Sequence, residues 1–189
     1  MITSPRLVLR TLTAAEAERT LDNSARSASG ERAPDGLASD RPEFADGYPS
    51  TFATEVLRLV ALYPATDHNI GGGMPDLGPW LIERKSDQAI IGTVSCARTA
   101  DPSEVTVGYD LAPSCWGDGY ATEALTAVVA HLLSVPAVWR VCAETRADHL
   151  ASRRVMEKSG LRWMRDEVVD HDGRDVKLAH YAIDRPGPL

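Results

Sequence analysis

The sequence predicts an α/β (α+β) fold in which a mixed sheet combines antiparallel hairpins with one parallel strand pair. Apolar and polar residues alternate strictly over 104–111, as in a strand with one buried face. A glycine turn follows, and apolar residues then recur at helical spacing from Ala121 to Leu133. A further strand is expected over 138–145. Strand, helix and strand in this order predict a βαβ unit with parallel strands and a right-handed connection.

The remaining elements are expected to flank this unit. Leu7–Arg10 predicts a first strand, and Thr13 and Glu16 predict a capping box for a helix from about Ala14 to Asp22. A later helix is indicated by apolar residues at i, i+3, i+4 and i+7, namely Val56, Leu59, Val60 and Tyr63. Asp148 is a suitable N-cap for a last helix that ends near Gly160. Two antiparallel pairs are expected, at 80–83 with 89–94 and at 161–169 with 176–183.

Two connections contain residues that favour loops. Residues 23–50 are rich in Ser, Gly, Asp and Pro and have no sustained apolar period, so a long irregular loop is expected there. Gly71–Gly73 predicts a second flexible connection. With no internal repeat, residues 1–189 are expected to form a single domain.

The composition is that of a globular protein, with 43% hydrophobic and 25% charged residues. The net charge of −7 argues against nucleic acid as the main partner and suits a cationic substrate. Three scattered cysteines, no signal-peptide pattern and no apolar run of membrane-spanning length favour a cytoplasmic protein that does not enter a membrane. A homodimer is compatible with the sequence, which contains no specific signal for one.

The turn Gly117-Asp118-Gly119 is the clearest candidate for a binding site. It lies between a strand that ends near Ala112 and a helix that begins near Tyr120, where free N–H groups and the helix dipole attract anions. The sequence lacks the P-loop pattern, and Thr122 occupies the third glycine position of a dinucleotide fingerprint. Taken alone, the two glycines are equally consistent with a tight turn that binds nothing.

The residues around this turn resemble a known family. The segments Gly108-Tyr109-x-Leu111-Ala112-Pro113 and Trp116-Gly117-x-Gly119-Tyr120-Ala121-Thr122-Glu123-Ala124 resemble the acetyl-CoA-binding region of the GNAT acetyltransferases, specifically their RimJ/RimL-type branch. The resemblance continues in Ser4-Pro5-Arg6-Leu7-x-Leu9-Arg10, Ala143-x-Thr145 and Ser152-Arg153-Arg154-Val155-Met156-Glu157-Lys158-x-Gly160-Leu161. It covers nearly the whole chain outside 23–50.

This resemblance implies a GNAT-like mixed sheet, mostly antiparallel, with helices on both faces. The parallel strands 104–111 and 138–145 would splay apart to admit the pantetheine arm of acetyl-CoA. A backbone N–H near Leu111 would polarise the thioester carbonyl. The implied coenzyme-binding residues are Leu111, Trp116, Gly117, Asp118, Gly119, Tyr120, Ala121, His149 and Ser152.

The resemblance also implies an N-acetyltransferase that transfers acetyl from acetyl-CoA to a primary amine, on a protein N-terminus or a small molecule, by direct attack. Ser152 would stabilise the departing thiolate, because the branch places a serine there. The glutamate that the branch often carries is replaced by Thr106, so Glu104 and Asp110, on the same strand face, are the candidate bases.

His149 stands where the branch usually has asparagine, so it could replace the asparagine's hydrogen bonds, act as the base, or lie on the helix surface. The other histidines have no metal-ligand spacing, so no metal is expected, and core or surface roles are predicted for His68, His131, His171 and His180. Because both the glutamate and the asparagine are absent, a non-catalytic acetyl-CoA-binding module is the alternative function.

Overall fold

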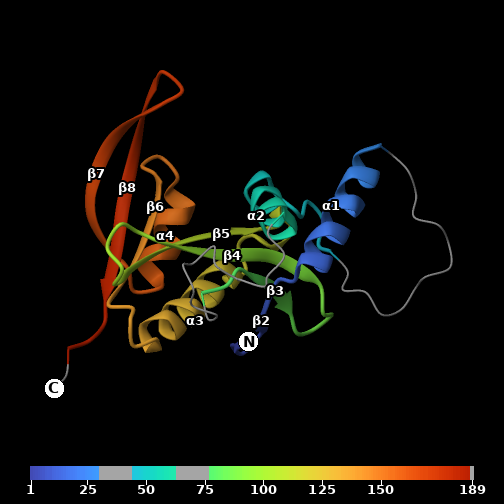
Figure 1. The fold of residues 1–189 in the computed structure, drawn as a ribbon, viewed down its shortest axis with the longest axis horizontal. Coiled ribbons are helices and arrows are strands. Elements are labelled where there is room, and N and C mark those ends of the chain that lie inside the picture. The colour runs from blue at the N-terminus through green and yellow to red at the C-terminus, as the bar shows by residue number, and fades with distance from the viewer. Residues whose placement is uncertain (30–43, 63–76, 188–189) are drawn as a thin grey trace.

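A computed structural model describes residues 1–29, 44–62 and 77–187, and contains one eight-stranded sheet in the order β1-β2-β3-β4-β5-β6-β8-β7 (Figure 1). Neighbouring strands are antiparallel except β5 and β6, which are parallel. The predicted fold class is therefore confirmed. The strands are β1 Ile2–Thr3, β2 Leu7–Thr11, β3 Trp80–Arg84, β4 Ile90–Arg98, β5 Glu104–Leu111, β6 Arg140–Arg146, β7 Arg162–His171 and β8 Arg174–Asp184.

Helices cover both faces of the sheet. Figure 1 shows α1 (Ala14–Ser29) and α2 (Thr51–Leu62) together on one side, with α3 (Tyr120–Ser134) on the other. The helix α4 (Leu150–Lys158) packs against α3, and a 3₁₀ turn, η1 (Pro113–Cys115), follows β5. No helix in the described ranges is long and apolar enough to cross a membrane.

The alternation of strand residues produces a separate core under each helix layer. On β3, Trp80 and Ile82 belong to the larger core under α3, whereas Leu81 between them belongs to the core under α1 and α2. The apolar positions of α3 are buried as predicted: Ala124, Leu125, Val128, Val129 and Leu132. Because both faces are packed, a residue's position along a strand decides whether it faces α2 or α3.

The loop prediction for 23–50 is wrong at its beginning. The helix α1 starts at the predicted capping box, in which the backbone N–H of Thr13 donates to Glu16 Oε2 at 3.1 Å. It continues to Ser29 instead of ending near Asp22. The added residues include alanine and arginine, which are good helix formers, and the first strong helix breaker is Gly30. Residues 30–43 lie outside the described part of the chain, and so do the predicted helix position Tyr63 and the Gly71–Gly73 connection.

Several predicted element ends also differ. The N-cap of α4 is His149, because the Asp148 carboxylate is bonded to Arg146 at 2.9 and 3.1 Å and does not cap the helix. The predicted C-terminal Gly160 has φ +91°, as a residue just beyond a helix end often does. The strand predicted from 138 begins at Arg140, where pairing with Glu104 starts. The short strand β1 was not predicted.

Candidate active site

The strands β5 and β6 separate shortly after they begin. Their parallel pairing runs only from Glu104 with Arg140 to Thr106 with Cys142. Both strands continue beyond this point, β5 in register with β4 up to Leu111 and β6 in register with β8 up to Arg146. The sheet therefore opens between two strands that are each held on their outer side. This opening is the splay that the family resemblance implies.

The backbone of Leu111 faces this opening. The N–H of Ala112 donates to the Ile91 carbonyl at 2.8 Å, and Leu111 lies opposite Gly92. Because antiparallel strands alternate between hydrogen-bonded and non-hydrogen-bonded pairs, the N–H and C=O of Leu111 point away from β4. The Leu111 carbonyl accepts the indole N–H of Trp116 at 2.8 Å. The Leu111 N–H, which the resemblance implies would polarise the thioester carbonyl, therefore lies on the side where β6 diverges from β5.

The glycine turn has the backbone conformation that its sequence predicts. Gly117 and Gly119 have φ values of +90° and +79°, and Gly119 is the N-cap of α3. The N–H of Glu123 donates to the Gly119 carbonyl at 3.0 Å, so the preceding helical N–H groups have no acceptor within the helix. A Cβ at Gly117 would meet no atom within 4 Å, so the turn is open on that side.

Arg6 packs against this turn, a position that the sequence motifs did not predict. Its guanidinium donates to the Asp118 carbonyl at 3.0 Å and lies over the Tyr120 ring at 4.4 Å. Its Nε is bonded to Glu123, which also accepts the Arg6 backbone N–H and the Ser4 hydroxyl, both at 2.7 Å. These contacts lower the pKa of Glu123, although burial opposes them. No local pattern could pair Arg6 with a turn more than a hundred residues away.

On the α4 side of the opening, Ser152 is joined to Tyr109 of β5. The two hydroxyl oxygens are 2.9 Å apart, and the Tyr109 hydroxyl also lies 3.0 Å from the Ser152 carbonyl oxygen, which accepts from it. Burial raises the pKa of Tyr109 to about 12, so the phenol stays protonated at neutral pH. The sequence predicted Ser152 as a hydroxyl donor. It gave no role to Tyr109, whose position became clear only when β5 and α4 were brought together.

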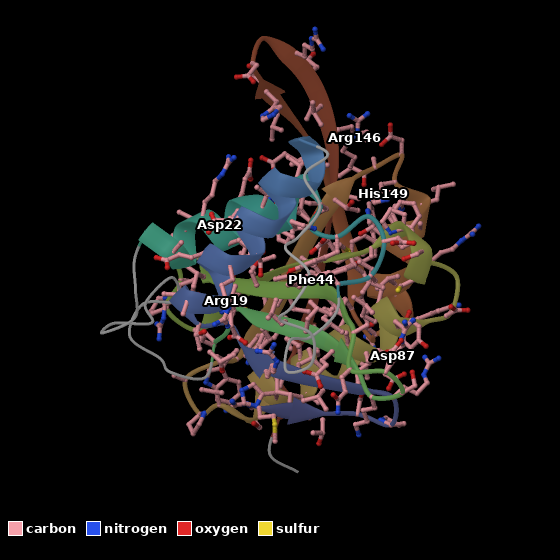
Figure 2. The ribbon with its side chains drawn as sticks, turned by 90° about the vertical axis from the view of Figure 1, so that its right-hand side faces the viewer. Arg19, Asp22, Phe44, Asp87, Arg146 and His149 are labelled. Atoms are coloured by element: carbon pink, nitrogen blue, oxygen red, sulfur yellow. The ribbon has the colours of Figure 1, made fainter. Side chains whose placement is uncertain are left out.

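His149 lies on the same side. Its Nδ1 is 3.3 Å from the Thr145 hydroxyl, a contact that joins the end of β6 to the start of α4. Figure 2 shows His149 near Arg146 in this connection, with Asp87 elsewhere on the molecule. The His149 side chain is exposed, so this position is compatible both with a hydrogen-bonding substitute for asparagine and with a place on the helix surface.

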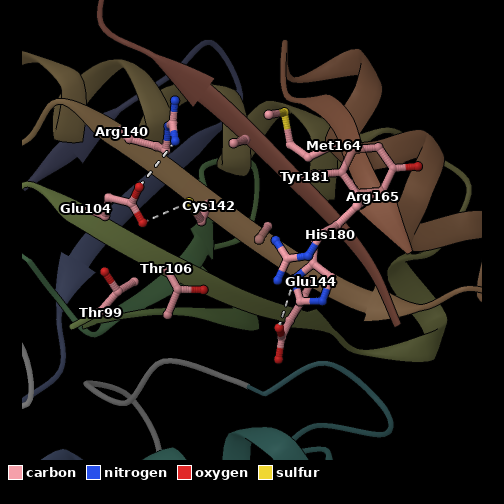
Figure 3. Close-up of a pocket in the computed structure, with 12 residues that line it drawn as sticks. Thr99, Glu104, Thr106, Arg140, Cys142, Glu144, Met164, Arg165, His180 and Tyr181 are labelled. Carbon is pink, nitrogen blue, oxygen red and sulfur yellow. Dashed lines mark hydrogen bonds and ion pairs between the residues drawn. The ribbon is translucent and has the colours of Figure 1, made fainter. Parts of the chain in front are cut away.

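The opposite face of the opening carries two cavities. The first, of about 370 Å³, extends from β5 across β6 to β7 and β8, and Figure 3 shows its lining. The second, of about 430 Å³, lies between α2 and the strands β4 and β5, and includes Phe52, Glu55 and Gly108. Thr106 and Glu144 line both cavities, so the two meet where β5 and β6 diverge.

Of the two predicted bases, Glu104 lies in the first cavity at the closed end of the opening. Its carboxylate is 3.3 Å from Arg140, and the Cys142 thiol lies 3.9 Å away (Figure 3). Glu104 is therefore held in an ion pair, and Arg140 also binds Asp184. Burial raises the pKa of the Cys142 thiol to about 11, which keeps that thiol protonated.

Asp110 has a different environment. Both carboxylate oxygens are enclosed without a hydrogen bond of normal geometry to any described residue. Burial raises its pKa to about 6, with a small opposing effect from the nearby Ser50 hydroxyl and Thr93 backbone. Its negative charge in turn contributes to the raised pKa of Tyr48. Asp110 does not belong to the lining of either cavity described above.

The described residues contain no group of three or more His, Cys, Asp or Glu side chains placed to hold a metal ion. The predicted core or surface role fits His131, which packs edge-on against Trp80, and His171, which is exposed at the end of β7. His180 is partly exposed and lines the first cavity, a position that the sequence did not predict. His68 lies outside the described residues.

Comparison with known proteins identifies the family and the fold. Residues 6–162 match the sequence profile of the family described as "Acetyltransferase (GNAT) domain". The uncharacterized N-acetyltransferase YoaA of Bacillus subtilis (strain 168) is 32% identical over 82 residues, which are 43% of this chain and 46% of that protein. The chain thus matches less than half the length of this curated relative.

Two solved structures share the fold across nearly the whole chain. A GNAT-family acetyltransferase from Bacillus anthracis superposes with a TM-score of 0.66 at 19% identity, covering 97% of this chain and 98% of the other. RimL, a ribosomal L7/L12 α-N-protein acetyltransferase solved with coenzyme A, gives 0.66 at 17% identity, with 96% and 95% covered. At these identities the likeness concerns the fold alone. The profile match, which spans most of the sequence, shows that the chain belongs to the GNAT acetyltransferase family.

Proposed function

We propose that this chain transfers the acetyl group of acetyl-CoA to a primary amine by direct attack. The observation that carries the proposal is the opening between β5 and β6, which has different chemistry on its two faces. Hydroxyl donors, Tyr109 and Ser152, lie on the α4 face. Carboxylates, among them Glu144, line the cavities on the α2 face. The sheet runs continuously from β1 to β8, which supports one catalytic domain over residues 1–189.

The coenzyme fits the α3 end of this opening. A pyrophosphate would bind to the N–H groups of the turn from Trp116 to Ala121, where the positive end of the helix dipole lies. The pantetheine arm would then follow the opening past Leu111 and His149. Arg6 adds a guanidinium to the turn, so we include it among the residues that favour the anion.

The transfer has a simple balance. The amine nitrogen bonds to the thioester carbonyl carbon, the carbon–sulfur bond breaks, and the sulfur takes the electron pair. Overall, an ammonium and acetyl-CoA give an amide, CoA thiol and one proton. The Leu111 N–H would stabilise the carbonyl oxygen as it becomes negative. The Ser152 hydroxyl, which Tyr109 contacts at 2.9 Å, would donate to the departing sulfur.

The proposed acceptor is a protein N-terminus or a small-molecule amine. Of the carboxylates first predicted as bases, Glu104 is already paired with Arg140, and Asp110 is enclosed behind β5. We therefore assign Glu104 a supporting negative charge in the first cavity, and Asp110 an electrostatic effect on the adjacent strands rather than contact with the amine.

Two measurements test the proposal. Saturating acetyl-CoA, at about 100 times its dissociation constant, should stabilise the protein by about 2.7 kcal/mol and raise its melting temperature. Release of CoA thiol should then be followed with N-terminally free peptides and with small amines such as spermidine. Stabilisation without thiol release from any acceptor would favour the non-catalytic binding module. No stabilisation at all would exclude both functions.

A further inference from the structure

The side chain of His180 lies between two carboxylates at the edge of the first cavity. Its Nδ1 is 3.4 Å from Oε2 of Glu144 on β6, and its Nε2 is 3.1 Å from Oε2 of Glu167 on β7. Figure 3 shows the His180 ring and the Glu144 carboxylate side by side in the cavity. The histidine thus joins three neighbouring strands through one row of charged groups.

The two ring nitrogens have different surroundings. Nε2 is fully enclosed and has no aligned hydrogen bond to any residue that the structure describes, although Glu167 lies at ion-pair distance. An enclosed polar atom without a hydrogen bond is uncommon and points to a functional role. The Glu144 side chain, beside Nδ1, is 56% exposed and lines both cavities. The two carboxylates are both exposed, at 56% for Glu144 and 45% for Glu167, whereas the His180 side chain between them is 19% exposed, and of the two carboxylates only Glu144 lines the cavities.

Glu144 lies at the opening between β5 and β6. The last parallel pair is Thr106 with Cys142, so continuing the register would place Glu144 opposite Gly108. Glycine leaves that position without a side chain, and a Cβ there would come within 2.8 Å of Phe52. Phe52 fills the space directly over Gly108, and Phe52, Gly108 and Glu144 together line the second cavity, on the face opposite Tyr109 and Ser152.

We propose that Glu144 binds the ammonium group of the acceptor and that Nδ1 of His180 takes its proton, while Glu167 is a positioning residue at Nε2. This rests on the proposed function and adds the acceptor site to it. The proton leaves nitrogen for Nδ1, which frees the lone pair for attack. The imidazolium that forms is stabilised by a carboxylate on each side.

The remaining charged groups around the row are consistent with this role. Arg165 of β7 donates to Glu167 at 2.8 Å and so shares the carboxylate behind the ring. Arg140 of β6 is occupied by Glu104 and Asp184. On the α2 side, Glu55 lines the second cavity with Glu144 and adds a negative charge for a cation. The acceptor class that fits is a primary ammonium on a chain that can lie beneath α2.

Steady-state kinetics with the best acceptor found for the wild-type protein test this assignment. His180→Gln should lower kcat about 100-fold and change the pH profile of kcat, because the general base is gone. Glu144→Gln should raise KM for the acceptor about tenfold and leave KM for acetyl-CoA unchanged. Glu167→Gln should shift the pH profile with a smaller loss of kcat.

Controls separate chemistry from folding. Asp175→Asn removes an exposed acid from the same strand as His180, outside the proposed row and both cavities, and should leave both kinetic constants unchanged. Every variant should retain the thermal stabilisation by acetyl-CoA. His180→Gly should regain activity when imidazole is added, which a purely structural loss would not allow. Unchanged kcat and pH profile in His180→Gln would overturn the assignment.

A binding measurement keeps this test separate from the proposed function. The nitrogen NMR signals of the His180 ring, assigned by their loss in His180→Gln, should shift when n-butylammonium is added to the wild-type protein. The shift should vanish in Glu144→Gln. If no acceptor is acetylated but this shift occurs, the transfer activity is refuted and the amine site is retained. If no shift occurs, the amine site is refuted.

Discussion

The hydroxyl of Tyr109 lies 2.9 Å from that of Ser152 and joins β5 to α4 across the opening of the sheet. The contact places a protonated phenol, with a pKa of about 12, behind the serine predicted to serve the leaving group. The single phenol proton is donated to the Ser152 carbonyl oxygen, so the tyrosine oxygen accepts from the Ser152 hydroxyl. Tyr109 therefore holds Ser152 in place at the opening, and under the proposed mechanism the serine proton would turn from Tyr109 to the sulfur.

Replacing Ser152 should reduce the rate without loss of coenzyme binding. Ser152→Ala removes the donor nearest the sulfur, so kcat should fall roughly 100-fold, as for loss of a general acid. Tyr109→Phe keeps the aromatic ring and should lower kcat by a smaller factor, because Ser152 retains its hydroxyl. Thiol-release kinetics measure both effects. Ser134→Ala, at the exposed end of α3, is the control; wild-type kcat in Ser152→Ala would contradict the role.

Gly119→Ala should destabilise the turn and weaken coenzyme binding. Residue 119 has φ +79°, which costs an L-residue about 1–2 kcal/mol, although a Cβ would meet only the Arg6 side chain, at 3.7 Å. Urea unfolding and calorimetric titration with acetyl-CoA measure the two effects. Gly187→Ala, where a Cβ meets nothing within 4 Å and φ is not positive, should be neutral. If the two variants had equal unfolding free energies and equal affinities for acetyl-CoA, the backbone conformation of Gly119 would be unimportant.

Arg6 and Glu123 should be coupled in stability. Their ion pair is half-exposed on the arginine side, with side-chain exposures of 47% and 14%, so a coupling energy of about 0.5–1 kcal/mol is expected. Arg6→Met, Glu123→Gln and the double variant complete a thermodynamic cycle measured by urea unfolding. Because these contacts lower the pKa of Glu123, the coupling should be present at pH 7 and diminish on acidification through that pKa. Additive effects at pH 7 would exclude the coupling.

Asp110 should make the protein less stable as the pH rises. Its pKa increases from 3.8 to about 6 on folding, so the folded state holds the proton more tightly than the unfolded chain. The stability contributed by this protonated carboxyl is fully present below about pH 4 and is lost as the pH rises to about 6. Asp110→Asn cannot ionise and should be more stable than wild type at pH 8 by up to about 3 kcal/mol, at 1.36 kcal/mol per pKa unit.

Urea unfolding of wild type and Asp110→Asn at pH 4 and pH 8 provides the measurement. The difference in the free energy of unfolding between the two proteins should be larger at pH 8. A difference that does not change with pH would mean that burial does not raise this pKa.

Much of the fold follows from residues that are close in sequence. Strict alternation defined β5 from Glu104 to Leu111, and helical spacing followed by proline defined α3. The capping box at Thr13 fixed the start of α1, but its end was misplaced because serines and aspartates were interpreted as a loop. These signals are local, since each depends on how neighbouring side chains are distributed between water and a core.

The glycine turn and Ser152 could likewise be assigned from motifs, because backbone conformation and helix position are properties of short segments. By itself, the sequence determined most of the elements, the mixed sheet and the backbone conformation of the glycine turn. Only the tertiary structure placed Arg6 beside Asp118, Tyr109 beside Ser152, and His180 between Glu144 and Glu167. These contacts depend on strand register and on which elements become neighbours in the sheet, and the energy that decides both comes from packing the whole core.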